Sequence, residues 1–220
     1  MDVLDIIFKI SHAPFNKLYK TSFLNDLNAE FLHGSYYEDL EFFYKVFLKA
    51  EKVSVLPQYL YYYRIRDHSI SNSGDEGSFD IFNILKTTKQ NLIDANIYDK
   101  VKQQWLMFVI VNLKYVYLRL MSEYKNRFID LMKENYESLD LNEVDNFDGW
   151  HYEDQSFYKA ISVCDNYEIF DLTFEKFNYE FLAKHFETAY NDVKAENESL
   201  KKQLNEKGSS NNLLKRFVKL

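Results

Sequence analysis

The chain has 220 residues with a net charge of −7, 18% aromatic residues, only 5 Gly and 2 Pro, and a single cysteine. Scarce Gly and Pro argue against a sandwich or barrel with many tight turns and favour long helices, whereas the acidic balance argues against general nucleic-acid binding, which needs a basic face. A single cysteine, Cys164, excludes an internal disulfide and a multi-cysteine zinc site, so we expect a cytoplasmic protein. The length of the chain favours one globular unit with an appendage.

The front of the chain, residues 1–77, has the pattern of mixed helix and strand. Helices are predicted over 15–24 and 38–50. Val-rich and Tyr-rich runs around 53–55 and 61–65 then favour strands. The sequence therefore places the small strand content near the front.

The next region, residues 78–187, has apolar residues at helical spacing, including a long stripe from Trp105 to Leu120 that should face a core. Further helices are predicted around 155–162 and 173–187. The most apolar stretch, 105–111, is shorter than the roughly 20 residues that cross a bilayer. We therefore expect a helical region without an integral membrane segment.

A coiled-coil-like helix is predicted at 188–207, within a heptad that can be written from Ala183 onward. Its a positions are Ala183, Tyr190, Asn197 and Leu204, and its d positions are Phe186, Val193 and Leu200. An Asn at one a position fixes register in coiled-coil dimers. Two interpretations stay open here: a homodimer through 183–207, and a terminal helix that packs back on its own domain.

The last segment, 208–220, is predicted to be a flexible tail with basic and apolar residues. "GSSNN" favours a break in the helix, and "LLKRFVKL" combines Leu, Phe and Val with Lys and Arg. Such a composition suits weak peripheral contact with an anionic surface at the inner face of a membrane. A disordered tail is the alternative.

The helix at 38–50 begins with acids whose role is the main question in this sequence. Ser35 followed by Glu38 has the spacing of a capping box. Acids at a helix N-terminus also complement the helix dipole, by roughly 0.3–1 kcal/mol each. Physical chemistry thus explains Glu38 and Asp39 without any ligand.

The surrounding motifs give a second interpretation. "APFNKLYKTSFL" and "GSYYEDLEFFYKVFLKAEKVSVLPQYLYYYRIRDHSIS" resemble, in order and spacing, the second half of the catalytic domain of family 2 glycosyltransferases, which are inverting enzymes of the GT-A type. The likeness covers residues 13–73, and extends to the helical region only in general character. It implies an α+β, predominantly helical chain: the second half of a GT-A-like α/β domain at 1–77, then a helical region and a coiled-coil-like helix.

The resemblance also implies roles. Asp39 matches the family's catalytic base, which takes the proton from an acceptor sugar hydroxyl, and Glu38 would be its helper or only a cap. The residues implied to bind the donor diphosphate or the acceptor are Asn16, Lys17, Arg64, Arg66 and His68. The intact enzyme would use a divalent metal, Mg²⁺ or Mn²⁺, which His68 could touch. Alternatively, Arg64 and Arg66 lie on a solvated strand face and His68 in a surface loop.

The chain also departs from the family pattern. Full enzymes begin with a βαβ nucleotide-binding half that carries an Asp-x-Asp, and neither this motif nor a Gly-rich phosphate loop occurs here. We therefore expect a saccharide acceptor as partner, a nucleotide sugar only together with a donor-binding half, and no transferase activity from these residues alone. The alternative function is a non-catalytic helical interaction or dimerisation module.

Overall fold

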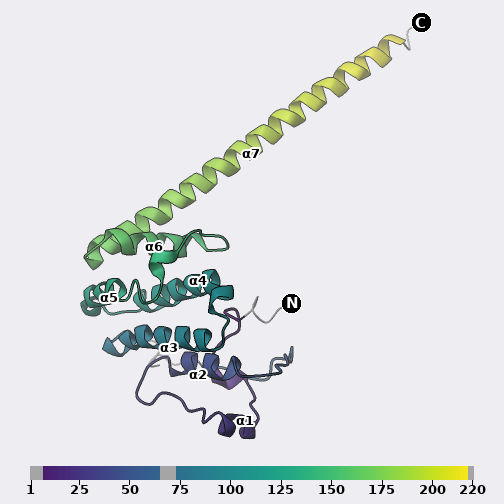
Figure 1. Ribbon diagram of the computed structural model, residues 1–220. Helices are drawn as coiled ribbons and strands as arrows, with labels where there is room; N and C mark the ends of the chain where they lie inside the picture. Colours follow the sequence, from purple (N-terminus) through teal and green to yellow (C-terminus); the bar gives the residue numbers. More distant parts are fainter. Residues whose placement is uncertain (1–6, 65–72, 218–220) are drawn as a thin grey trace. The chain divides into compact units, whose positions relative to one another are not determined.

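A computed structural model describes residues 7–64 and 73–217, with side chains up to residue 203, and they form helices joined by irregular segments (Figure 1). The α-helices are α1 (Thr21–Asp26), α2 (Glu38–Phe47), α3 (Asp80–Asp94), α4 (Tyr98–Tyr117), α5 (Ser122–Glu134), α6 (Tyr152–Val163) and α7 (Tyr167–Phe217). Short 3₁₀ turns are η2 (Pro14–Asn16), η4 (Glu76–Phe79) and η5 (Leu141–Glu143). The chain divides into two compact units, Met1–Phe174 and Glu175–Leu220.

The structure contradicts the expected α+β fold, since residues 7–64 and 73–217 contain no β-strand. A GT-A-like α/β domain is therefore absent from this part of the chain. The strands expected at 53–55 and 61–65 are instead an exposed, irregular segment over 51–64, and Ile65 lies outside the described residues. Strand propensity reflects packing against neighbouring strands, and a strand pair without further strands or a covering helix is marginal in water. Val and Tyr in this segment thus favour a strand only if a partner supplies the rest of a sheet.

Helix α4 is the centre of the first unit. Helices α2, α3, α4 and α6 lie in contact one after another in that order, with α5 against α6 (Figure 1). The buried side chains of α4 are Tyr98, Val101, Trp105, Leu106, Phe108, Val109, Ile110, Leu113, Val116 and Tyr117. Their spacing gives apolar contacts on more than one face, as a helix needs when neighbours cover both sides. The stripe predicted from Trp105 onward is confirmed as core.

Aromatic packing joins the ends of the first unit to α4. Phe8 lies with its ring centroid 5.0 Å from that of Phe108 and 6.1 Å from that of Trp105. At the other end, Phe170 in the first turn of α7 is fully buried, 4.9 Å from the ring of Tyr117. Such ring pairs add to the free energy of burial by about 0.5–1.5 kcal/mol each. The first turns of α7 therefore belong to the core of this unit.

The connection between α5 and α6 is fixed to the neighbouring helices by polar contacts around Asp140. Lys89 Nζ in α3 lies 2.7 Å from Asp140 Oδ2, and the Tyr98 hydroxyl in α4 donates to the same oxygen. Burial by itself would raise the pKa of Asp140, but the hydrogen bonds from Lys89 and Tyr98 and the nearby positive charges outweigh it, so its pKa lies below the usual value. This carboxylate is more stable as an anion in the folded chain than in the unfolded one.

We predict that Asp140→Asn makes the stability of the first unit less dependent on pH. A depressed folded-state pKa contributes stability above the unfolded-state value of about 3.9, and this contribution is lost as pH falls through the folded-state pKa. Asn tolerates the left-handed backbone of this residue (φ 58°), so the backbone should not be strained further. Urea unfolding should show a loss of about 1–2 kcal/mol at pH 7 that becomes smaller at pH 3. An equal loss at both pH values would contradict this role.

The second unit consists of α7 from Glu175 onward. The helix was expected to break at 208–212, but the backbone stays helical through this segment to Phe217. One Gly in a helix costs only about 1 kcal/mol, and Ser and Asn cost less, so "GSSNN" is too weak a signal to end it. The expected membrane contact of 208–220 remains a prediction, because no side chains are described there. Among the described residues, no helix has the length and apolar character needed to cross a bilayer.

Candidate functional site

The start of α2 is held by Tyr36 and not by the expected capping box. Tyr37 occupies the N-cap in a left-handed conformation, without a side-chain cap hydrogen bond, and Ser35 Oγ donates to the Tyr36 carbonyl. The Tyr36 backbone N–H donates to Asp80 Oδ2 at 2.9 Å, and its hydroxyl donates to Asp75 Oδ2 at 3.2 Å. These bonds anchor the helix start to Asp75, just before η4, and to the first residue of α3. The capping-box prediction was wrong, because Tyr37 and not Ser35 is the N-cap, and the Ser35 hydroxyl donates to the Tyr36 carbonyl instead.

Asp39 lies in the first turn of α2 with its carboxylate partly open to solvent. Its side chain is 29% exposed, and its Oδ2 lies 3.9 Å from His12 Nε2. Glu38 is the first residue of the helix and is half-buried. Asp39 is thus an accessible carboxylate with an imidazole beside it, an arrangement that suits proton transfer.

Lys17 and Asn16 lie in the same neighbourhood. Lys17 Nζ donates to Asn16 Oδ1 and to the Ala13 carbonyl, both at 2.8 Å, and lies 4.9 Å from the centroid of the Phe43 ring. Phe43 follows Asp39 by one helical turn, so Lys17 covers the α2 face that carries the acid. The structure therefore brings Lys17, with its sequence neighbour Asn16, close to Asp39, which follows more than 20 residues later in the chain.

Electrostatics tie His12 and Lys17 to Asp39. Burial lowers the pKa of His12. The Asp39 carboxylate raises this pKa and the Lys17 ammonium lowers it, and the net result is a pKa below the usual value. Burial also lowers the pKa of Lys17, and Asp39 opposes that fall. His12 is therefore mostly neutral at pH 7, which leaves the Lys17 ammonium as the positive charge that interacts with Asp39. Sequence reasoning missed His12, because a histidine in a loop carries no periodic signal.

We predict opposite pKa shifts of His12 in two variants. Asp39→Asn removes a negative charge and should lower the pKa of His12 further, whereas Lys17→Met removes a positive charge and should raise it. The ring signals of the five histidines, followed by NMR over a pH series, give the measurement, and His12→Gln assigns the signal. Unchanged titration in both variants would show that the three side chains do not form one cluster.

The Tyr-rich segment packs on the same loop through Phe15. Phe15 stacks on Tyr61 and Tyr63 with ring centroids 4.7 and 5.0 Å apart. Arg64 follows this stack in the sequence, and its side chain is exposed. Arg66 and His68 lie outside the described residues. The structure thus connects 61–63 with the loop that carries Asn16, and leaves the roles of the three basic residues as predictions.

Glu41 is a second feature that sequence reasoning missed. It lies within a run of buried residues of α2, is only 4% exposed, and its Oε2 has no hydrogen-bond partner. A buried carboxylate without a partner is costly. A signal for it exists in the sequence, because Glu41 stands between Leu40 and Phe42 in the buried run of α2.

Metal binding finds no support in the described residues. In 7–64 and 73–217, no three His, Cys, Asp or Glu side chains are grouped so that they could hold a metal ion. His12 and Asp39 alone do not form such a site, and His68 lies outside the described part.

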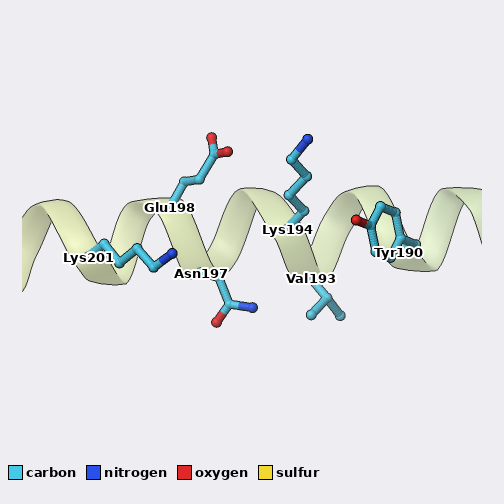
Figure 2. A pocket seen from close by; sticks show the side chains of 6 residues that line it. All are labelled: Tyr190, Val193, Lys194, Asn197, Glu198 and Lys201. Atoms are coloured by element: carbon cyan, nitrogen blue, oxygen red, sulfur yellow. The ribbon is translucent and has the colours of Figure 1, made fainter.

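A shallow hollow on α7 is the other surface feature (Figure 2). Its lining residues are Tyr190, Val193, Lys194, Asn197, Glu198 and Lys201. All belong to one exposed helix, so the hollow is not the concave pocket that small ligands need.

Comparison of the chain with protein-family models, with curated proteins and with solved structures finds no match. The family resemblance therefore rests on the sequence motifs alone.

Proposed function

We propose that this chain is the acceptor-side part of a glycosyltransferase that transfers a sugar from a nucleotide-sugar donor to a saccharide acceptor, in the synthesis of a cell-surface polysaccharide or glycan. The supporting observation is the cluster of Asn16, Lys17 and Asp39, because the motifs with family resemblance converge there. His12 and Phe43 complete its surroundings.

In the proposed step, the acceptor hydroxyl oxygen attacks the anomeric carbon of the donor. The bond from that carbon to the diphosphate oxygen breaks, the nucleoside diphosphate leaves with the electron pair, and the anomeric centre inverts. The hydroxyl proton passes to a carboxylate oxygen of Asp39. A carboxylate suffices as base because the hydroxyl becomes strongly acidic only as the new bond forms.

Lys17 supports this role by its charge and position. Its Nζ is held by the Ser11 and Ala13 carbonyls and the Asn16 amide, so the ammonium group is fixed beside α2. A positive charge held there attracts the Asp39 anion and any phosphate of a donor. Asn16 and Lys17 are therefore positioning residues in the proposal.

The helical fold sets a condition on this proposal. The described residues provide no nucleotide-binding sheet, so donor binding must come from polypeptide outside them. The exposed segment 51–64, with Val53, Val55 and its tyrosines unpaired by any strand, is a surface that such a part could cover.

The test is a transfer assay with and without a donor-binding domain. The 220-residue chain should give no transfer from any nucleotide sugar, and a fusion that places an α/β nucleotide-sugar-binding domain with an Asp-x-Asp before residue 1 should give transfer to a saccharide acceptor. Donor hydrolysis without acceptor transfer in every fusion tried would count against the acceptor role.

A second candidate function, a dimerisation module, is favoured by one observation. Helix α7 extends beyond the first unit with large apolar side chains exposed along it. The two functions are compatible, because the site at α2 and the exposed part of α7 share no residue.

A further inference from the structure

The second unit exposes a regular row of large apolar side chains. Tyr179, Phe186, Val193 and Leu200 follow one another at intervals of seven residues, and their exposed fractions are 71, 67, 57 and 48%. Unit two is a single helix, so none of its own elements can cover this row. Isolated helices are only marginally stable in water. An exposed apolar row of this length therefore indicates that a binding partner covers it.

A second row completes a heptad pattern. Ala183, Tyr190 and Asn197 are also seven residues apart and exposed, and they alternate with the first row at spacings of four and three. Figure 2 shows Val193 and Asn197 on one side of α7 and Lys194 and Glu198 on the other. The two rows correspond to the d and a positions of a coiled coil, with charged residues flanking the seam.

We propose that the partner is a second copy of this chain, joined through residues 179–201 in a parallel, in-register two-stranded coiled coil. A parallel arrangement places each a residue opposite its own copy, so Asn197 faces Asn197 and each amide has a hydrogen-bonding partner. An apolar partner would instead leave the Asn197 amide unpaired at the seam.

Charge complementarity supports the same register. In a parallel coil, a g residue lies beside the e residue five positions further along the other helix. This places Glu196 beside Lys201 of the second copy, twice by symmetry. Two further pairs, Leu182 with Glu187 and Ala189 with Lys194, contain no like charges. These three pairs therefore attract or are neutral. At the start of the stretch, Glu180 lies beside Glu175 of the second copy, which is a like-charge pair, and each helix also holds its Glu180 in an ion pair with Lys176.

The proposal is independent of the glycosyltransferase function, since it uses only residues of the second unit. The dimer carries two copies of the Asp39 site if both proposals hold. Two linked sites bind a repetitive polymer more tightly than one, through effective concentration.

Sedimentation equilibrium of the full chain tests the dimer. The chain should be dimeric, and Val193→Glu with Leu200→Glu should raise the dissociation constant at least about a hundredfold, because two seam side chains per copy lose their burial. The matched control, Ala195→Glu with Ser199→Glu, adds the same charge outside the seam and should stay dimeric. A monomeric wild-type chain, or equal weakening by both pairs, would overturn the proposal.

Charge exchange tests register and direction. Glu196→Lys alone and Lys201→Glu alone each place like charges together and should raise the dissociation constant several-fold, whereas the double exchange should restore it. Circular dichroism checks that each variant keeps its helix. A dimer in which the double exchange is as weak as the sum of the single ones would refute the parallel, in-register arrangement, even if the chain dimerises.

Discussion

Asp39→Asn is expected to lower the turnover of the enzyme formed with a donor-binding domain by about 100- to 10 000-fold, the range over which a general base contributes. The asparagine amide has nearly the shape of the carboxylate but cannot accept the acceptor's proton. Asp39 is partly exposed and has only the 3.9 Å contact with His12 among the ion pairs of the site. Folding should therefore change little, and the loss should appear in the chemical step.

Glu38→Gln is the matched control for this prediction. Glu38 precedes Asp39 in the same helical turn, and the same kind of change there removes one negative charge from the helix start. It should cost only about 0.3–1 kcal/mol in helix stability and leave most of the turnover. Donor binding, measured by calorimetry, should be unchanged in both variants. Equal turnover losses in both, or none in Asp39→Asn, would show that Asp39 is not the base.

Trp105→Ala is expected to lower the free energy of unfolding of the first unit by about 3–5 kcal/mol, as large-to-small changes of buried aromatics do. Trp105 is fully buried at the centre of α4 and packs against Phe8 and Phe108. Because Phe8 leads to His12, the cavity should also loosen the segment that carries the site. Typical domains have only about 5–15 kcal/mol in total, so the variant should be barely stable.

Trp105→Phe separates packing from polarity at this residue. The indole Nε1 has no hydrogen-bond partner in the core, and removing an unpaired buried donor recovers about 1–3 kcal/mol. The loss in Trp105→Phe should therefore be clearly smaller than in Trp105→Ala. Trp150, the other of the 2 tryptophans, reports unfolding by fluorescence in both variants. A loss below about 1 kcal/mol in Trp105→Ala would contradict the central place of α4.

The helices show what local patterns can predict. Apolar spacing located the helices now seen as α2, α4 and α6 and marked the Trp105 stripe as core. A helix that buries one face has apolar residues that recur with the helical period, so the sequence shows this face directly. Ends were less predictable. The start of α2 depends on Asp75 and Asp80, which reach Tyr36 from a segment about 40 residues away, as their hydrogen bonds show. Such contacts leave no local signal.

The candidate site was predictable only in part. The motifs pointed to Asn16, Lys17 and Asp39, and the structure brings them together. His12 and the buried Glu41 emerged only from packing. The charge state of His12 depends on burial and on two charges from other segments, and no sequence spacing encodes that sum.

The sequence by itself determined the helical character of residues 78–207 and the heptad rows of α7, because both follow from periodicity and composition. Tertiary structure alone decided that 51–64 forms no strand: a strand needs partners for its backbone, and the described residues supply none. It also decided that the loop carrying His12 and Lys17 folds onto the first turn of α2. That contact gives Asp39 its neighbours, since burial and proximity arise only when distant segments pack.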